Sequence, residues 1–428
     1  MTELERALPS ESGRGLLARG LGRGYGDCAQ NSGGTVIETT DVDAFTIHES
    51  DPTADAVLVT AEAGASIDRL LHALVPQGLF VPVTPGTRYV TVGGAVASDI
   101  HGKNHHRKGS WCQHVTSLRL QTADGQVVEV GPERDPELFW ATAGGMGLTG
   151  TVLEATFRCP RVSSSQLLVD TDRAADLDAV LDLMASGDHA YEYSVAWIDL
   201  MAGGRSTGRS VLTRGRFATA EELAPGTDDP LAYRAGVLAT APPFVPDGLL
   251  NRLTVRAFNE VWFRKAPVRR RDELQSIPTF FHPLDMVAGW NRVYGPAGFL
   301  QWQFVVPFGA ERTLRRIVEE LGRARCTSFL AVLKAFGEGD PGPLSFPAPG
   351  WTLALDIPTA VPGLGPLLDR LDELVVAEGG RIYLAKDSRV RPELVPAMYP
   401  RLDEWRAVRH RVDPDGRITS DLARRLGL

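Results

Sequence analysis

Short apolar runs alternate with turn residues from about residue 18 to residue 157. Their length and their β-branched content predict strands, and the hairpin turn Ala123-Asp124-Gly125 separates two of them. One segment differs, because residues 67, 70, 71 and 74 are apolar at the spacing of a helical face, with Ser66 as the expected N-cap. These elements predict an α+β domain of roughly 160 residues. The predicted strands cover residues 35–37, 57–60, 116–122, 126–130 and 150–158.

The pattern changes after Cys159-Pro160, where aromatic residues become frequent and the predicted strands lengthen. Proline and glycine crowd residues 225–246 and 337–350, which predicts long loops of the kind that wall a cleft. Residues 364–378 predict an amphipathic helix that ends at Gly379-Gly380, before a strand at 381–385 and a charged helical tail. The other predicted elements are helices at 174–184 and 313–321, and strands at 191–198, 298–306 and 351–357.

Glycine gathers in three segments that expose the backbone, at residues 19–27, 83–102 and 144–150. The first has glycine at every second position from 20 to 26, but turn formers follow it instead of the helix that a nicotinamide-type dinucleotide loop needs. We therefore expect a strand–loop–strand turn whose N–H groups hold a pyrophosphate, with Arg19 and Arg23 nearby; a purely structural glycine turn is the alternative. Together the segments predict one long ligand that lies across several loops.

Composition and charge narrow the classes of protein. The chain has 428 residues, 43% of them hydrophobic, which is enough for two or three domains with a core. A net charge of −8 argues against a surface that coats nucleic acid, so no nucleic-acid partner is expected. The four cysteines are far apart and form no CxxC pair, which excludes a zinc ribbon or a disulfide framework. No leader pattern and no apolar run of 18 residues is present, so we expect any membrane contact to be peripheral.

Histidines cluster at positions 101, 105 and 106. A metal site is disfavoured, because Gly102 interrupts the cluster, basic residues flank it and no carboxylate or thiolate lies within it. A histidine and a lysine opposite a polyanionic or redox ligand is favoured, and a solvated basic loop is the alternative.

Two further patterns carry polar side chains into apolar surroundings. Tyr383 and Lys386 either line a pocket or lie on a surface strand, and these residues taken alone favour the surface strand. They fall on opposite faces if the strand at 381–385 is regular, so both can face one ligand only if the strand ends between them or one acts through its backbone. Gln301, Gln303 and Lys334 alternate with aromatic residues, which is typical either of a core or of strands that wall a pocket.

Seven segments, in matching order over nearly the whole chain, resemble the flavin subunits of the decaprenylphosphoryl-β-D-ribose epimerases. This family belongs to the vanillyl-alcohol-oxidase-like superfamily of FAD proteins. The segments are RGLGRGYGDCAQNSGG, PGTRYVTVGGAVASDIHGKNHH, ELFWATAGGMGLTG, FHPLDM, WNRVYGPAGFLQWQF, LSFPAPGW and AKDSR.

The resemblance implies a two-domain α+β fold in which the first and last parts of the chain bind FAD under an antiparallel-sheet substrate domain. The implied boundaries are 1–163, 164–380 and 381–428. Arg23 and Tyr25 stand where covalent relatives place a histidine, so non-covalent FAD is expected. The implied FAD contacts are Ala18, Arg19, Gly20, Leu21, Gly22, Arg23, Gly24, Tyr25, Gly26, Asp27, Cys28, Gly86, Thr91, Val92, Gly93, Gly94, Ser98, Asp99, Ile100, His101, Val152 and Tyr383.

The resemblance also implies a reaction, in which hydride passes from C2′ of a prenylphosphoryl ribofuranose to flavin N5 and leaves the 2′-keto sugar. An NAD-dependent short-chain reductase partner completes the epimerisation, for cell-wall arabinan synthesis. Lys386 is the implied base, with Tyr25 and His101 as further catalytic residues. The implied substrate contacts are Lys103, Trp197, His282, Gln301, Gln303, Lys334, Thr352, Ala354 and Lys386. We expect the protein to lie in the cytoplasm or at the periphery of a membrane, on either the cytoplasmic or the periplasmic side.

Three residues depart from the family pattern. Ala354 replaces a cysteine that faces the flavin in many relatives, Thr352 replaces an asparagine and Phe281 a tyrosine. The thiol is not part of the chemistry, so Ala354 is compatible with activity. An FAD-dependent oxidase of another sugar or alditol and a silent ligand-binding paralogue are the alternatives, and the presence of Lys386 counts against the second.

Overall fold

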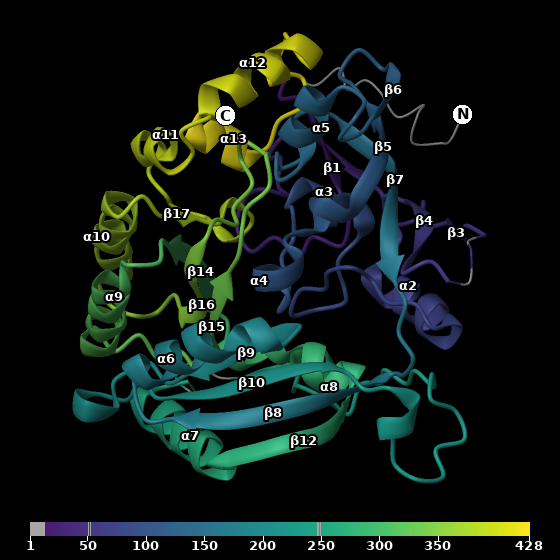
Figure 1. Ribbon diagram of the computed structural model, residues 1–428. Helices are drawn as coiled ribbons and strands as arrows, with labels where there is room; N and C mark the ends of the chain where they lie inside the picture. The colour runs from purple at the N-terminus through teal and green to yellow at the C-terminus, as the bar shows by residue number, and fades with distance from the viewer. Residues whose placement is uncertain (1–12, 50, 52, 246–247, 249) are drawn as a thin grey trace.

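The computed structural model describes residues 13–49, 51, 53–245, 248 and 250–428. Two large antiparallel sheets organise these residues (Figure 1). A five-stranded sheet has the order β3-β4-β7-β5-β6 and an eight-stranded sheet has the order β12-β8-β10-β9-β15-β16-β14-β17. One large buried apolar cluster lies mainly on the eight-stranded sheet, and a second combines the five-stranded sheet with residues of β8 and β9. The predicted α+β class is confirmed.

Four strands of the five-stranded sheet form where strands were predicted, whereas β3 was not predicted. Its strands are β3 (Phe45–Ile47), β4 (Ala56–Glu62), β5 (Val115–Gln121), β6 (Val127–Val130) and β7 (Thr151–Pro160). Helix α2 (Ile67–Leu74) covers it with an apolar face, and the Ser66 side chain accepts a hydrogen bond from the Arg69 N–H at 3.1 Å. The 123–125 turn joins β5 to β6, as expected.

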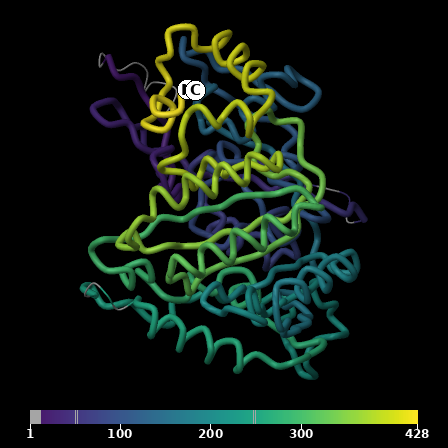
Figure 2. The backbone as a smooth tube through the Cα atoms, turned by 90° about the vertical axis from the view of Figure 1, so that its left-hand side faces the viewer, coloured from purple at the N-terminus to yellow at the C-terminus, as the bar shows by residue number. Residues whose placement is uncertain are grey.

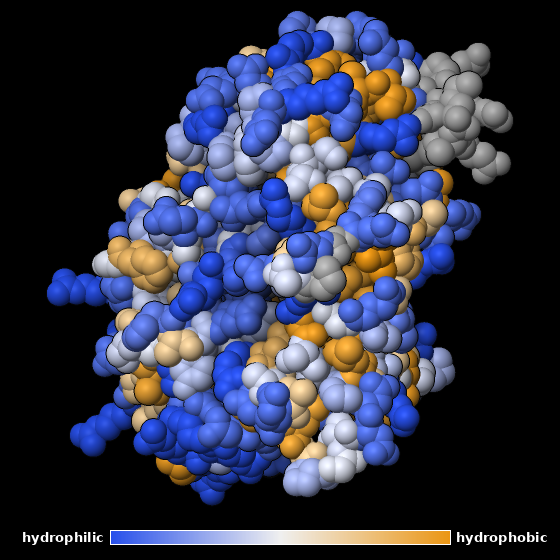
Figure 3. All heavy atoms as spheres, turned by 45° about the vertical axis from the view of Figure 1, so that its right-hand side comes forward, coloured by the Kyte–Doolittle hydropathy of each residue, from blue (hydrophilic) through white to orange (hydrophobic). Residues whose placement is uncertain are grey.

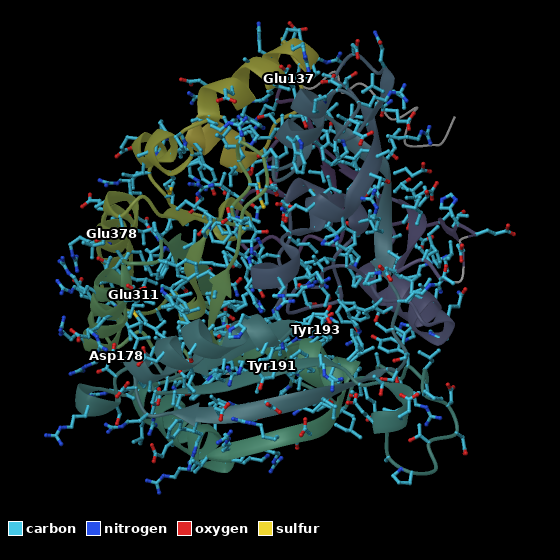
Figure 4. All side chains as sticks on the ribbon, in the orientation of Figure 1. Glu137, Asp178, Tyr191, Tyr193, Glu311 and Glu378 are labelled. Carbon is cyan, nitrogen blue, oxygen red and sulfur yellow. The ribbon has the colours of Figure 1, made fainter. Side chains whose placement is uncertain are left out.

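The eight-stranded sheet contains several strands that the sequence analysis did not predict. Those strands are β8 (Gln166–Ala174), β10 (Ser210–Phe217), β12 (Arg269–Ser276) and β15 (Ala331–Phe336). The predicted ones are β9 (Tyr193–Ile198), β14 (Phe299–Val306) and β16 (Gly350–Pro358). Tyr191 and Tyr193 lie near the junction of the two sheets (Figure 4), and Tyr193 packs edge-on against Phe281.

Helices cover this sheet on one side. Helices α9 (Glu311–Arg323) and α10 (Leu364–Ala377) lie side by side (Figures 1 and 4), and the Thr313 hydroxyl donates to Glu378 at 2.6 Å. The predicted start of a helix at 174 was wrong, because Ala174 ends β8. The helix is α6 (Leu177–Gly187), which begins after Asp176, whose side chain accepts from the Ala179 N–H.

The predicted strand at 381–385 was also wrong in its length. Strand β17 covers only Arg381–Ile382, and a 3-10 turn η8 (Leu384–Lys386) follows at once. Of the predicted 225–246 loop, Ala239–Thr240 forms the short strand β11, which pairs with β13 (Val287–Ala288), and Pro246 lies outside the described residues. Helix α3 (Val92–Ala97) was not predicted from its glycine-rich sequence.

The tail of the chain returns to its beginning, as Figure 2 shows where yellow tube meets purple at the top of the molecule. Strand β1 (Leu16–Arg19) pairs with β2 (Thr35–Glu38), and Leu16 also bridges to Ile418. The tail contains α11 (Val395–Met398), α12 (Leu402–Val412) and α13 (Asp421–Leu426). The boundaries at residues 163 and 380 stay predictions.

The surface that Figure 3 shows is mainly hydrophilic, with separate apolar patches. Among the described residues, no helix combines the length and the apolar composition needed to cross a bilayer.

Candidate active site

The first glycine segment is an open turn that follows β1. The backbone N–H groups of residues 21–24 donate to no other described residue, and Gly22 has a left-handed φ of +62°. A run of free N–H groups in a turn is a ready site for phosphate oxygens. The free N–H groups of this turn could therefore hold the oxygens of a pyrophosphate.

The same glycines also let three parts of the chain meet. A Cβ on Gly20 would lie 2.1 Å from the Thr91 hydroxyl oxygen, and one on Gly26 would lie 1.5 Å from the Asp387 carbonyl oxygen. The close approach confirms the structural interpretation of this segment, while the binding interpretation stays a prediction. The glycines place the turn against the second segment and against the tail, while the N–H groups stay free.

The tail closes over this turn through charge-assisted hydrogen bonds. The Arg425 guanidinium donates to both carboxylate oxygens of Asp27 and to one of Asp387, each at 2.8 Å. The Tyr25 N–H donates to the Ala385 carbonyl at 3.1 Å. Residues almost 400 positions apart are thus fixed at one point.

The second segment places His101 below α3. Thr91 caps α3, accepting from the Gly94 N–H at 3.2 Å, and the Tyr383 hydroxyl donates to the Ser98 carbonyl at 2.7 Å. Asp99 has a left-handed φ of 38° and is held by the Ser345 hydroxyl at 2.6 Å. Gly86 is exposed, and a Cβ there would meet nothing within 4 Å, so the protein leaves that position open. Val152 is buried on β7, against which α3 packs.

The third glycine segment packs against protein instead. A Cβ on Gly144 would lie 3.0 Å from the Ser345 Cα, and one on Gly145 would lie 2.2 Å from the Ala141 carbonyl oxygen. These glycines therefore allow two parts of the chain to pack closely against each other.

One face of the eight-stranded sheet carries most of the predicted substrate contacts. Strand register pairs Gln303 with Ala354, and Lys334 with Thr352, across neighbouring strands. Because side chains alternate along a strand, the members of each pair share a face. Trp197 on β9 pairs with Val332, which itself pairs with Ala354, and its indole N–H donates to the Phe329 carbonyl at 3.0 Å.

His101 is the hub of a buried polar network. Its Nε2 lies 2.9 Å from Nε2 of Gln303, and its Nδ1 lies 2.9 Å from Nζ of Lys334. Burial, and then the neighbouring Lys334, hold the pKa of His101 well below its ordinary value, so the ring is neutral. With the amide orientation assigned to Gln303, the ring proton lies on Nδ1 and faces Lys334, which requires a neutral amine there. Burial, helped by Lys103 and Lys386, lowers the pKa of Lys334 to about 7, which agrees with that requirement.

His105 and His106 turn away from this network. His105 Nδ1 accepts from the Gly337 N–H, while His106 Nε2 faces the backbone carbonyls of Asp188 and Tyr191. Within the described residues, no group of three His, Cys, Asp or Glu side chains is placed to hold a metal ion.

Lys386 and Tyr25 meet at the end of β17. The Lys386 Nζ lies 4.2 Å above the centre of the Tyr25 ring, because the strand ends at Ile382 and the 3-10 turn rotates Lys386 inward. Both Tyr383 and Lys386 therefore point into the site, which the sequence left open. Burial lowers the pKa of Lys386 to about 8, although the Asp356 carboxylate partly opposes that shift.

Asp356 is a residue that the sequence analysis missed. It is fully buried on β16, accepts from the Gln301 amide at 2.6 Å, and lies 3.5 Å from the Tyr294 hydroxyl. Burial raises the pKa of Asp356 to about 7. The signal was present, since Thr352, Ala354 and Asp356 follow at every second position of a predicted strand and so share one face.

Lys103 and His282 form a second polar group beside the network. The Lys103 Nζ donates to the Phe280 carbonyl, and burial lowers the pKa of Lys103 to about 7. His282 is fully buried; its Nε2 contacts the Thr84 hydroxyl at 2.8 Å, and its Nδ1 has no partner among the described residues. A buried polar atom without a partner is costly, so His282 fits a role in contacting a ligand.

Comparisons with known proteins agree with this arrangement. Residues 7–131 match the FAD binding domain family. The chain is 46% identical to the decaprenylphosphoryl-beta-D-ribose oxidase of Mycolicibacterium smegmatis over 98% of this chain and 90% of that protein. It is 43% identical to an uncharacterized protein of Streptomyces coelicolor over 85% of this chain and all of that protein. A mitochondrial L-galactono-1,4-lactone dehydrogenase of rice is 33% identical over 26% of this chain and 19% of its own length. FAD is therefore the cofactor of this chain.

We expect Arg425→Ala to loosen the closure of the tail over the glycine turn. The change leaves the Asp27 and Asp387 carboxylates without their shared cation, which costs about 2 kcal/mol and lowers the Tm by about 2 °C. Thermal unfolding followed by flavin fluorescence measures the Tm, and ultrafiltration measures the rate of FAD release, which should rise. Arg316→Ala, which removes an exposed cation on α9, is the control and should change neither quantity. Unaltered FAD retention in Arg425→Ala would show that the ion pairs do not hold the site closed.

Proposed function

Because the chain belongs to the decaprenylphosphoryl-β-D-ribose oxidase family, we propose that it oxidises the 2′-hydroxyl of a prenylphosphoryl-β-D-ribofuranose to the 2′-keto sugar. It is an FAD-dependent oxidoreductase that acts on a CH–OH group. The oxidation is the first half of an epimerisation to the arabinose form.

The observation that carries the proposal is the buried amine of Lys386 beside Tyr25, at the place where the glycine turn, the tail and the polar sheet face meet. Oxidation of an alcohol needs a base for the hydroxyl proton. A pKa of about 8 leaves part of Lys386 neutral near pH 7, so its Nζ can accept that proton. When bound, FAD supplies the acceptor for the hydride that leaves the carbon.

The anion of the substrate has a matching set of buried amines. Burial lowers the pKa of Lys103 and of Lys334 to about 7, so each is partly neutral in the free protein. A bound phosphate stabilises the ammonium form, because an opposite charge in a low-dielectric site attracts strongly. We propose that Lys103 and Lys334 hold the phosphate, while His101, Gln303 and Thr352 orient the sugar through their hydrogen-bond network.

We also propose that FAD is held without a covalent bond. No histidine lies in residues 18–28, and the resemblance implies that Arg23 and Tyr25 stand where covalent relatives have a histidine. Cys28 is the one thiol of this segment; burial and the nearby Asp27 raise its pKa to about 11, which keeps it protonated and unreactive. An NAD-dependent reductase as the partner and a peripheral approach to a membrane complete the proposal, since the substrate carries a lipid chain.

Flavin bleaching tests the substrate. We expect rapid loss of the oxidised flavin absorbance when prenylphosphoryl ribose is added without oxygen, and little change with free alditols at the same concentration. Mass spectrometry of the product should show the loss of two hydrogens. Bleaching by alditols alone would establish a different sugar or alditol oxidase, and no bleaching by any alcohol would favour a silent paralogue.

Lys386→Ala tests the base. We expect the variant to keep its FAD spectrum but to lose flavin reduction by about 100-fold or more, the usual size of a general-base effect. In the unaltered protein the rate of reduction should rise with pH through about 8, because deprotonation of Lys386 creates the active amine. Lys108→Ala, which removes an exposed lysine of α4 (His105–Lys108), is the control and should keep the rate and the profile. Full reduction at pH 7 in Lys386→Ala would place the base elsewhere.

Asp356→Asn tests whether the Asp356 carboxylate sets the pKa of Lys386. The Asp356 carboxylate raises the pKa of Lys386 against the effect of burial, so its removal lowers that pKa. The rising limb of the rate against pH should therefore move to lower pH, while the flavin spectrum is retained. An unmoved limb with a normal FAD content would show that Asp356 does not act on Lys386.

A further inference from the structure

Helix α7 (Arg252–Lys265) presents apolar side chains outward, at the lower edge of the molecule in Figure 1. Leu253 and Val261 are 79% and 66% exposed, and Phe258 and Trp262 are each 46% exposed. Leu253, Ala257 and Val261 follow at intervals of four, so they form one stripe along the helix. Large apolar side chains in such a stripe normally face a hydrophobic core. Their exposure here therefore indicates that this face of the helix is a binding surface.

The inner face of α7 is firmly attached, so the outward stripe is a property of the folded protein. Val255 and Asn259 are buried, and the Asn259 amide donates to the Asp199 carboxylate at 2.7 Å. Asn251 caps the first turn, accepting from the Leu253 N–H at 2.9 Å. The exposure of the stripe therefore does not come from a loosely attached helix.

The charge around the stripe is opposite to that of the whole protein. Residues 252–270 contain six Arg or Lys and one Glu, in a chain of net charge −8. Within the part of the chain that the structure describes, no carboxylate pairs with Arg252, Arg256, Lys265 or Arg269. A helix with an apolar face, a tryptophan and unpaired basic side chains matches the surface of an anionic bilayer.

A run of aromatic rings connects this helix to the active site. Phe258 contacts Phe329 at 5.7 Å between ring centres, and Phe329 contacts Tyr294 at 5.6 Å. Tyr294 stacks on Phe299 at 4.2 Å, and Phe299 contacts Tyr25 at 5.5 Å. Tyr25 is the residue whose ring lies under the Lys386 amine. An unbroken series of ring contacts thus leads from the exposed helix to the proposed base.

We propose that the outward face of α7 docks on an anionic lipid bilayer. The aromatic residues from Phe258 to Tyr25 would then line the path that the prenyl chain takes from that bilayer to the site. The proposal rests on the proposed function, because only a lipid-linked substrate has a prenyl chain for these aromatic residues to contact. The helix would lie in the interface with its stripe among the acyl chains and its basic residues at the phosphates. The substrate would then reach Lys386 while its lipid stays in an apolar environment.

Vesicle cosedimentation tests the docking face in the absence of substrate. The unaltered FAD-loaded protein should sediment with vesicles of phosphatidylcholine mixed with phosphatidylglycerol, and much less with phosphatidylcholine alone. Leu253→Glu combined with Val261→Glu should lower the partition coefficient by about tenfold or more, because both stripe residues become charged. Arg256→Ala should lower it by about fivefold on the anionic vesicles only.

Val127→Glu combined with Leu58→Glu is the matched control. It introduces the same two negative charges at exposed apolar residues of β6 and β4, on the other sheet, and should leave the partition unchanged. Partition of the α7 double variant equal to that of the unaltered protein, or no binding to anionic vesicles, would overturn the proposal. Sedimentation velocity gives a further overturning result, namely a dimer that the double variant dissociates, since a second copy would then cover the stripe.

A kinetic comparison tests the connection to the site. The double variant should reduce its flavin normally with a short-chain prenylphosphoryl ribose in detergent, and at least about tenfold more slowly with long-chain substrate embedded in anionic vesicles. Equal rates of the double variant on the two substrates would overturn the proposed path of the prenyl chain. Failure of the proposed function is separately visible, because the unaltered protein would then sediment with vesicles and yet show no bleaching with either substrate.

Discussion

The closure of the chain upon itself at Asp27, Arg425 and Asp387 is the constraint on which the site depends. The beginning of the chain supplies the glycine turn, and the end supplies Lys386 on the 3-10 turn after β17. Neither part builds a site alone, and the entropy of bringing such distant segments together must be offset by strong contacts. A bidentate guanidinium–carboxylate pair supplies both energy and direction. It orients the tail so that the Tyr25 N–H reaches the Ala385 carbonyl and the Lys386 amine settles over the Tyr25 ring.

Burial of amines governs the chemistry of the site. Lys103, Lys334 and Lys386 all have their pKa lowered by burial, and His101 stays neutral for the same reason. A cluster of three permanently charged amines in a buried site would repel one another, whereas partly neutral amines can coexist there. The proposed roles of these amines use that property, because one amine would accept a proton and two would become charged when an anion binds. The buried Asp356 carboxylate raises the pKa of Lys386 against the effect of burial, which distinguishes the environment of Lys386 from that of the other two amines.

The proposed substrate needs both a polar and an apolar environment in the protein. A prenylphosphoryl sugar has a charged centre between a polar end and a long apolar chain, so its site must offer both environments. The sheet face offers hydrogen bonds and amines around Gln303 and Lys334, while ring contacts lead from Tyr25 to Phe258 on α7. The proposed docking would account for the exposed stripe on α7, since a helix that meets acyl chains need not hide its apolar face.

By itself, the sequence determined the local elements and the kind of ligand. The length and β-branched content of short apolar runs predicted strands β4 to β7, Ser66 predicted the start of α2, and the glycine-rich turn predicted a phosphate site. The resemblance supplied the family and the FAD cofactor, which the comparisons confirmed. Only the tertiary structure decided where β17 ends, that residues 166–174 form strand β8, and that the charge of Asp356 acts on the pKa of Lys386. The reason is physical, because propensity and periodicity act between near neighbours, whereas a strand end, a shared sheet face and the pKa of a buried amine depend on groups that only folding brings together.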